Sequence, residues 1–423
     1  MPESCILTHA ASPKVVAAVA GLAFAQSLPT AFVMGALPLI WREQGYSLLQ
    51  IGALQALYLP WVLKALWAPL VDRASVSGQA RFRFLLMAQV LVSLVCLALA
   101  GLPPGPQSAP TFVVILLLSI VSATADNAGD AVAIKLTPRH DSARVNGWRE
   151  AAMLISAAFG AGAGYAIAMK FGWSVAVAFI AAFSASGVLA TITIKQRILC
   201  FDGRSVHSTR FANSLFLTSF LRPGGWLMFA IIALASAANR ITGANPRILL
   251  SDLGLPVEKL SVILGVLEPG AGVLGALAAG ALSASLGVAR VLPAAIALKA
   301  FVLLALAAAL QLSLFDNIIV MLFLLMTVCF AAIVTCFGGL IMRWSRKGSE
   351  ATDAASFFTA AALVWFIMQP LSGFLADTFE YEGLFLISGI LVLPMSLCMP
   401  LLLRMTLLHE TERSAGSGGA PRK

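Results

Sequence analysis

Two carboxylates one helical turn apart within a long apolar stretch are the first candidates for chemistry in this chain. Asp126 and Asp130 lie four residues apart, so in a helix they share one face. Ionising both so close together and away from water is unfavourable, so the pair could take up and release a proton. We therefore predict a proton-coupling role for both. An equally open alternative is a static network that only holds helices together, with Lys64, Lys135, Arg149 and Glu150 as its other members.

Lys64 is the expected partner of these carboxylates. Lys64 and Asp126 lie about equally far from the outer ends of their apolar stretches, roughly 24 Å at 1.5 Å per residue. They could therefore pair, and Lys64 could also contact a ligand. Tyr58 and Trp61 precede Lys64 in the same stretch and could line an aromatic cavity. Aromatic residues in such stretches more often face lipid or neighbouring helices.

A second candidate group surrounds Arg240. Asn239 precedes it, and the segment Gly243-Ala-Asn-Pro246-Arg247 follows, a Gly/Pro interruption that predicts a broken helix. Broken helices near the middle of a membrane often mark binding sites, so Arg240 is the first choice for an anionic substrate group, with Asn239 beside it. Glu268, at a similar expected depth, is a candidate counter-ion or proton acceptor. An interhelical ion pair without a ligand role is the open alternative.

Motifs for other kinds of chemistry are missing. The sequence contains no Walker A motif and no H-E-x-x-H, which argues against ATP drive within this chain and against a zinc protease. Its cysteines lack Cys-x-x-Cys spacing, so no metal site and no cofactor are predicted. An intramembrane enzyme would need a catalytic dyad such as His/Asp, but every histidine falls in a predicted loop or tail. We therefore predict a non-enzymatic protein without catalytic residues.

The elements that must position these residues are membrane-spanning helices. Apolar residues make up 60% of the chain and charged residues 11%, against roughly a quarter charged in an ordinary soluble domain. A helix needs about 20 mostly apolar residues to cross a bilayer, and unpaired backbone groups are too costly in lipid. The fold class is therefore all-α, with twelve transmembrane helices. We place them near 15–41, 47–70, 84–101, 111–135, 149–169, 173–194, 225–250, 258–284, 288–314, 317–342, 354–376 and 383–407.

Charge distribution predicts the orientation. Lysine and arginine concentrate in alternate loops, such as those around Arg73, Arg144, Lys195 and Arg346. Loops rich in these residues stay in the cytoplasm, so both termini are predicted to be cytoplasmic. This topology accounts for the net charge of +9, which leaves little reason to expect a nucleic-acid partner.

The chain also divides near its middle. The longest polar break separates six predicted helices from six, and Gly45 and Pro60 recur as Gly254 and Pro269 at the same offset. Such a recurrence is typical of an internally duplicated transporter. The predicted domains are an N-terminal half, a cytoplasmic linker, a C-terminal half and a cytoplasmic tail, at 1–194, 195–224, 225–407 and 408–423.

Five segments resemble the AmpG-like branch of the major facilitator superfamily, and together they span most of the chain. Leu37 to Gly52 and Leu59 to Arg73 look like its helix 1–2 signature, and the others are 122–130, 146–151 and 370–377. Asp72 and Arg73 match the superfamily's motif between helices 2 and 3, although the usual Gly-rich start and second basic cluster are degraded. The resemblance implies a twelve-helix 6+6 fold, alternating access, and a gating role for these two residues.

Within the branch, the compact length resembles most closely the RhtX/FptX-type siderophore permeases. This implies a monomeric symporter of the bacterial inner membrane that imports an iron–siderophore complex of the pyochelin type, with protons and membrane lipid as its other partners. Two alternatives stay open: a permease for muropeptides or another amphipathic solute, and a drug exporter.

Overall fold

The structure consists of helices and turns throughout its described part. The computed structural model describes residues 10–47, 51, 54, 56–105, 108–200, 217–222, 224–243 and 245–416, without the side chains of 257 and 407–416. Much of the predicted linker, the first nine residues and the last seven lie outside this part. The predicted all-α fold class is confirmed for the described residues.

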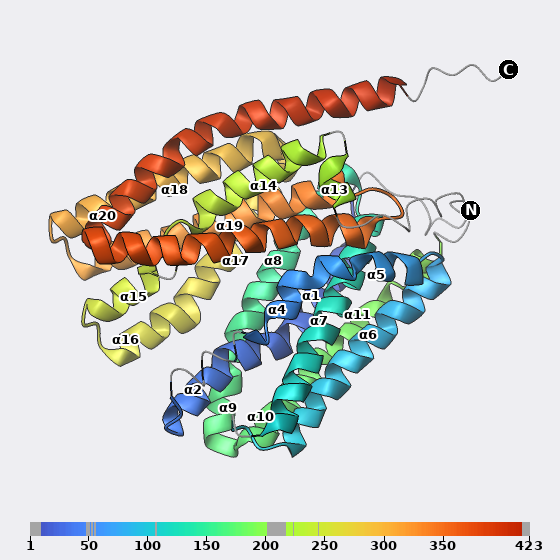
Figure 1. Cartoon of the computed structure of the whole chain (residues 1–423), viewed down its shortest axis with the longest axis horizontal. Coiled ribbons are helices and arrows are strands. Elements are labelled where there is room, and N and C mark those ends of the chain that lie inside the picture. Colours follow the sequence, from blue (N-terminus) through green and yellow to red (C-terminus); the bar gives the residue numbers. More distant parts are fainter. Residues whose placement is uncertain are drawn as a thin grey trace.

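The helices between 13 and 199 form one bundle, here called the N-terminal bundle, drawn in blue to green in Figure 1. Its helices are α1 (Pro13–Ala31), α2 (Leu37–Glu43), α4 (Leu59–Leu63), α5 (Ala68–Ala74), α6 (Gly78–Ala98), α7 (Ala109–Leu136), α8 (Ser142–Ala158), α9 (Gly164–Phe171), α10 (Trp173–Ser184), α11 (Ser186–Thr193) and α12 (Lys195–Leu199). Short 3₁₀ or π turns connect or extend several of them: η2 (Phe32–Ala36), η3 (Lys64–Leu66), η4 (Leu99–Gly101), η5 (Arg139–Asp141) and η6 (Phe159–Ala163).

The remaining helices form the C-terminal bundle, drawn in green to red. They are α13 (Thr218–Leu221), α14 (Gly225–Arg240), α15 (Asn245–Asp252), α16 (Val257–Val262), the π turn η8 (Ile263–Leu267), α17 (Glu268–Leu286), α18 (Val288–Gln311), α19 (Asp316–Trp344) and α20 (Glu350–Gly416). Glu380 has non-helical dihedral angles (φ 58°, ψ −177°), so α20 is two helices joined at a sharp kink.

Ten stretches of the described residues are long and apolar enough to cross a membrane, fewer than the twelve predicted. One of the ten, Glu350–Thr406, contains the kink at Glu380 and covers both of the last two predicted helices. The second predicted helix is absent from the ten because α4, η3 and α5 break it into short pieces. Pro69 explains part of this break, since proline lacks a backbone N–H and disfavours the helical turn before it.

Small residues let helices approach closely. Within the N-terminal bundle, a Cβ on Gly35 would lie 2.4 Å from that of Ala161, where η2 meets η6. Within the C-terminal bundle, a Cβ on Gly275 would lie 2.4 Å from the backbone oxygen of Val328. Any larger side chain at these two glycines would force the helices apart.

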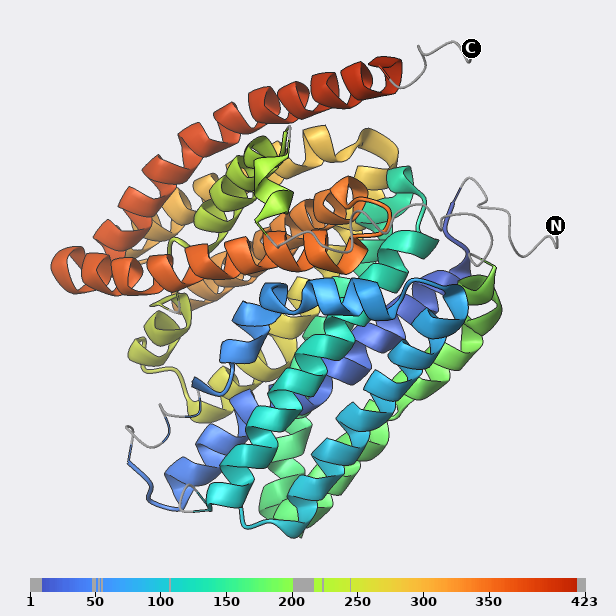
Figure 2. The same ribbon diagram turned by 45° about the vertical axis from the view of Figure 1, so that its right-hand side comes forward.

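The two bundles meet at one end of the molecule, here called the closed end. There α17 and α19 pack against α8, and α20 packs against α5 and α7. The helices at the opposite end, α2 and α9 in one bundle and α15 and α16 in the other, diverge in both views (Figures 1 and 2). Each bundle has its own tyrosine–carboxylate contact on this open side, Tyr165 with Glu43 and Tyr381 with Asp252. The closed end is the one that carries the predicted basic loops.

Candidate functional site

A buried charge cluster lies in the N-terminal bundle, on α7, α8 and the broken second helix. Lys64 contacts the Asp126 carboxylate directly, and its Nζ lies 3.7 Å from Asp130. Arg149 lies 3.0 Å from Asp126 and 2.9 Å from Asp130, and also reaches Glu150 at 3.0 Å. The expected pairing of Lys64 with both aspartates is therefore present.

Neutral side chains complete this cluster. Gln26 on α1 donates a 2.6 Å hydrogen bond to Asp126, and Gln89 on α6 donates one of 3.4 Å to Gln26. Asn127 donates to the backbone oxygen of Lys64, 3.1 Å away, where the second helix is broken. Four helices of the bundle thus converge on Asp126, which is only 1% exposed. Two cations face three carboxylates, so the cluster carries one negative charge in excess when all are ionised.

Arg240 presents a positive charge in the C-terminal bundle that forms no ion pair with a described carboxylate. It is the last residue of α14, and the chain resumes as α15 only at Asn245, so the predicted helix interruption is present. Its guanidinium lies over the rings of Phe330 (4.5 Å) and Trp365 (5.6 Å). Among the described residues no carboxylate lies within ion-pair distance of it.

The expected pairing of Glu268 with Arg240 is wrong. Glu268 accepts two hydrogen bonds from Arg247, at 2.9 and 2.7 Å, and the Arg247 side chain is 64% exposed. The turn after Arg240 explains the difference, because Gly243 (φ 54°) redirects the chain and brings Arg247 to the start of α17. Glu268 still lines the same cavity as Arg240.

Lys299 is a second buried cation in this bundle. Its Nζ donates to both oxygens of Asn239, the backbone oxygen at 2.5 Å and the side-chain oxygen at 3.1 Å. The backbone oxygen of Asn239 lies at the C-terminal end of α14, where helical carbonyls lack intrahelical partners. Lys299 therefore stabilises the helix break next to Arg240.

The two charged regions open onto one cavity between the bundles. It has a volume of about 310 Å³ and is lined by Lys64, Asp126, Arg149 and Glu150 from one side and by Arg240 and Trp365 from the other. A smaller cavity of about 200 Å³ continues past Arg240 to Lys299 and Glu268. The structure thus brings most of the predicted site residues together.

Aromatic and polar side chains shape this central cavity. Tyr58 and Trp61 stack nearly parallel, with ring centroids 6.0 Å apart, and both line it. Phe358 of the C-terminal bundle lies 5.3 Å from Lys64 and 5.4 Å from Arg149. The indole nitrogen of Trp61 and the hydroxyl of Ser236 are buried donors without a hydrogen-bond partner among the described residues. They are available to acceptors that a ligand would bring.

The proposed gating residue Asp72 links the bundles at the closed end. Its carboxylate accepts from the backbone N–H groups of Ala351 (3.0 Å) and Thr352 (2.9 Å), at the start of α20. Nearby, Lys135 lies 4.0 Å from Glu350. Arg73 follows Asp72 in α5 and is exposed. The geometry therefore joins Asp72 to the opposite bundle.

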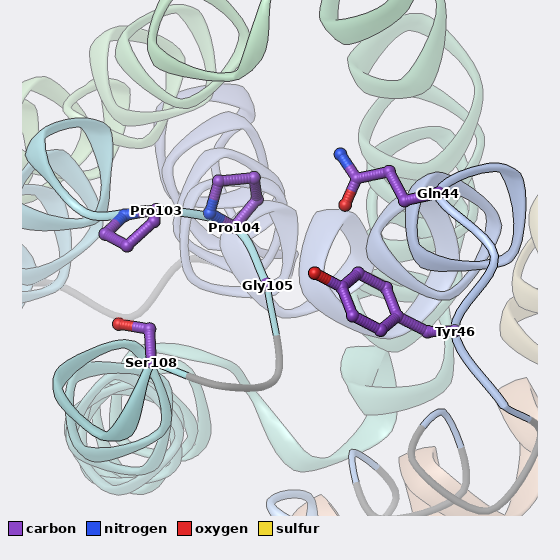
Figure 3. Close-up of a pocket in the computed structure, with 6 residues that line it drawn as sticks. All are labelled: Gln44, Tyr46, Pro103, Pro104, Gly105 and Ser108. Atoms are coloured by element: carbon purple, nitrogen blue, oxygen red, sulfur yellow. The ribbon is translucent and has the colours of Figure 1, made fainter.

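A larger hollow lies at the open end, within the N-terminal bundle. Figure 3 shows Tyr46 and Gln44 on one side of it and Pro104 and Ser108 on the other. Its volume is about 600 Å³, but none of its described lining residues is charged. It includes no predicted site residue, so the central cavity remains the better candidate.

Sequence reasoning missed several members of the site. Gln26, Gln89, Ser236 and Phe330 are polar or aromatic residues whose contacts depend on how distant helices meet, and nothing in their local spacing marks them. The sequence places Arg149 and Glu150 only in the alternative static network, and it predicts that the fifth helix starts near 149. The structure starts α8 at Ser142, which places both residues two turns inside the helix.

Two helical bundles around a charged central cavity are typical of a membrane transporter. The sequence profile of the Major Facilitator Superfamily matches residues 19–238, more than half of the chain. This chain belongs to the Major Facilitator Superfamily, and its members are typically transporters rather than enzymes.

Relatives match only part of the sequence. An uncharacterized protein of Haemophilus influenzae is 26% identical over 174 residues, 41% of either chain. The anhydromuropeptide permease of Escherichia coli K12 is 31% identical over 121 residues, 28% of this chain and 25% of the permease. The matches therefore span less than half the length of these relatives.

Solved structures match almost the whole fold. A bacterial homologue of the iron transporter ferroportin, in an outward-facing state, has a TM-score of 0.67 at 15% identity, covering 92% of this chain and 99% of that one. The human organic anion transporter MFSD10 has a TM-score of 0.69 at 14% identity, with 92% and 100% covered. At such identities the likeness concerns the fold alone.

Proposed function

We propose that this chain is a secondary transporter that imports a small amphipathic anion by alternating access. The observation that carries the proposal is Arg240, a cation without a described carboxylate partner, held between two aromatic rings in a cavity that both bundles line. A buried charge is costly unless it is paired, so such a cation favours an anionic ligand.

The cavity also suggests what the rest of the ligand looks like. Arginine can hold a carboxylate by two parallel hydrogen bonds. The free donors of Trp61 and Ser236 fit further acceptor oxygens, and the stacked pair of Tyr58 and Trp61 fits a planar or apolar portion. An amphipathic organic acid with several oxygen acceptors satisfies all three features.

Proton coupling is assigned to the N-terminal cluster. Lys64 and Arg149 balance two of the three carboxylates Asp126, Asp130 and Glu150, so one proton can be taken up without leaving a cation unpaired. Glu268 is balanced by Arg247 and offers no such excess. We therefore keep Asp126 and Asp130 as proton carriers and give Glu268 a supporting role in the cavity.

The finer assignments follow from the superfamily and the sequence. We propose twelve spans, with halves at 1–194 and 225–407, a linker at 195–224 and a tail at 408–423. We further propose a monomer in the bacterial inner membrane, with both termini and the closed end on the cytoplasmic side. In that orientation the cavity is accessible from the periplasm.

Two substrates fit this class. The resemblance to siderophore permeases favours an iron–siderophore complex of the pyochelin type, whose aromatic and acidic groups would suit Arg240 and the stacked rings. The partial match to the anhydromuropeptide permease of Escherichia coli favours a muropeptide instead. Both are amphipathic and anionic, and an exporter of drugs is a weaker third candidate.

Uptake into proteoliposomes tests the proposal. Vesicles holding the full chain would receive either an iron-loaded, pyochelin-type siderophore or an anhydromuropeptide, each labelled, with an inward proton gradient. We expect concentrative uptake of one of them, abolished by a protonophore and absent from empty vesicles. Failure to transport either, or equal transport by Arg240→Ala, would contradict the assignment.

A further inference from the structure

A second cavity lies on the outer face of the C-terminal bundle, apart from the substrate site. This groove, here called the α17–α19 groove, has a volume of about 380 Å³. Its walls are almost entirely apolar and include Ala278, Leu282 and Leu286 of α17, Ala294 and Leu298 of α18, and Val328 of α19. Leu282, Leu286 and Leu298 are each 45–50% exposed, so the groove opens to the surroundings of the bundle.

One charged residue stands at the rim of the groove. Arg290 lies in the first turn of α18, is exposed, and forms no ion pair with a described carboxylate. Gly287, which precedes α18 with φ 85°, provides no side-chain cap for the helix start. The positive end of the helix dipole and the guanidinium therefore lie close together at one mouth of an apolar groove.

We propose that the α17–α19 groove binds an acyl chain of an anionic phospholipid, with its phosphate held by Arg290. The surroundings of a membrane-spanning bundle are acyl chains, and an apolar groove excludes water but accepts a chain. Arginine pairs with phosphate oxygens through two parallel hydrogen bonds. Arg290 lies in the first turn of α18, on the closed side, so the lipid belongs to the leaflet at that end.

The position of the groove links this lipid to the closed end. The opposite face of α17 packs against α8, where a Cβ on Gly147 would lie 2.7 Å from the backbone oxygen of Ala276. That contact must separate when the closed end opens. An acyl chain bound on the other side of α17 fills the space into which α17 would move away from α8. The bound lipid therefore stabilises the conformation in which the closed end is sealed.

Neighbouring residues of α18 and α19 line the groove and the cavity that holds Arg240. Leu298 and Cys329 line the groove, and the next residues in each helix, Lys299 and Phe330, line the cavity that holds Arg240. Displacing α18 or α19 at the groove would thus shift the residues that support Arg240. We expect the lipid to influence the transport rate as well as the stability of the contacts at the closed end.

Native mass spectrometry of the purified full chain tests the lipid site without any knowledge of the substrate. The protein would be mixed with equal amounts of phosphatidylglycerol and phosphatidylcholine. Both lipids carry a phosphate, but the choline group neutralises that of phosphatidylcholine. We therefore expect phosphatidylglycerol, with its net negative charge near one cation, to bind with about fivefold preference. Arg290→Gln should abolish the preference, and Ala294→Phe, which fills the groove from an exposed position, should reduce binding of both lipids.

Matched variants make the test decisive. Arg83→Gln removes an exposed arginine of the N-terminal bundle and should leave the preference unchanged. Ala278→Phe fills the groove from α17 and replaces Ala294→Phe if that variant misfolds. Equal binding of both lipids to the wild type, or the same loss from Arg83→Gln as from Arg290→Gln, overturns the proposal. The outcome does not depend on uptake, so it is separable from failure of the proposed transport function.

Discussion

Asp72 and Thr352 are joined across the two bundles by two hydrogen bonds to one carboxylate oxygen. The backbone N–H of Thr352 donates at 2.9 Å and its hydroxyl donates at 2.6 Å. With the N–H of Ala351, these contacts make Asp72 a helix cap supplied by the opposite bundle. A cap that exists only while the bundles touch is a contact that must break when the closed end opens.

Low pH should therefore favour the conformation in which the closed end is sealed. Asp72 lies beyond the predicted end of the second span, and burial raises its pKa from 3.8 to about 6 despite the hydrogen bonds from Thr352 and Ala351, which lower it. The conformation in which the closed end is sealed binds a proton at Asp72 more tightly than a conformation that exposes this carboxyl to water. Protonation therefore stabilises the sealed conformation, fully below about pH 4, and this stabilisation is lost as pH rises through about 6.

Distance measurements between spin labels on the two bundles would check this pH dependence. Between pH 7 and pH 5 the ratio of closed to open molecules should rise roughly tenfold, as the two pKa values imply. Asp72→Asn should remove that rise, since an amide does not titrate in this range. An unchanged pH response in Asp72→Asn would assign it to another group.

The sequence predicted this site in part because intramembrane charges are rare and costly. Lys64, Asp126 and Arg240 were found from depth and spacing alone, and the break after Arg240 followed from Gly243 and Pro246. The partner of Glu268 could not be found in this way. The depth of a residue along a helix does not indicate the direction in which the chain leaves a helix break. The turn at Gly243 places Arg247, rather than Arg240, next to Glu268.

The fold was predictable to a similar extent. Apolar length identifies a helix that crosses a membrane, but it does not show where such a helix bends. The break at Glu380 falls between the predicted spans 354–376 and 383–407. The pieces around Lys64 were not predicted, because they depend on packing against the other bundle, as in the hydrogen bond from Thr359 to the backbone oxygen of Val62. Helix starts were also misjudged where polar residues such as Asn146 are buried between bundles.

Arg240→Ala should weaken substrate binding while the protein still inserts and folds. Loss of a charge-assisted contact is expected to raise KM on the order of 10- to 100-fold. Arg240→Lys should recover only part of this, because an ammonium cannot form the planar paired contact of a guanidinium. Uptake kinetics, with expression checked by size-exclusion chromatography, would measure both. Wild-type KM in a well-folded alanine variant would remove Arg240 from the site.

Glu268→Gln should have a small effect by comparison. Its partner Arg247 is largely exposed, so water can replace the lost ion pair, and the cost in unfolding free energy should be no more than about 1 kcal/mol. Proton-coupled uptake should persist. Thermal unfolding and proton flux of this variant would be compared with those of Asp130→Asn. Loss of proton-coupled uptake in Glu268→Gln would show that Glu268 takes part in proton transfer.

The charge cluster around Asp126 makes the sharpest prediction. Lys64→Met leaves Asp126, Asp130 and Glu150 with Arg149 as their only cation within the cluster, and breaking a buried pair in this way typically costs about 3–5 kcal/mol. The double variant Lys64→Met with Asp126→Asn restores the original excess of one negative charge. It should therefore be more stable than Lys64→Met alone, although coupled uptake should not return if Asp126 carries the proton.

Lys64→Met combined with Asp316→Asn, which neutralises an exposed acid outside the cluster, should show no such recovery. A double-mutant cycle on melting temperature and on proton-driven uptake would measure the coupling. Additive losses for Lys64 and Asp126 in that cycle would show that the two residues do not depend on each other.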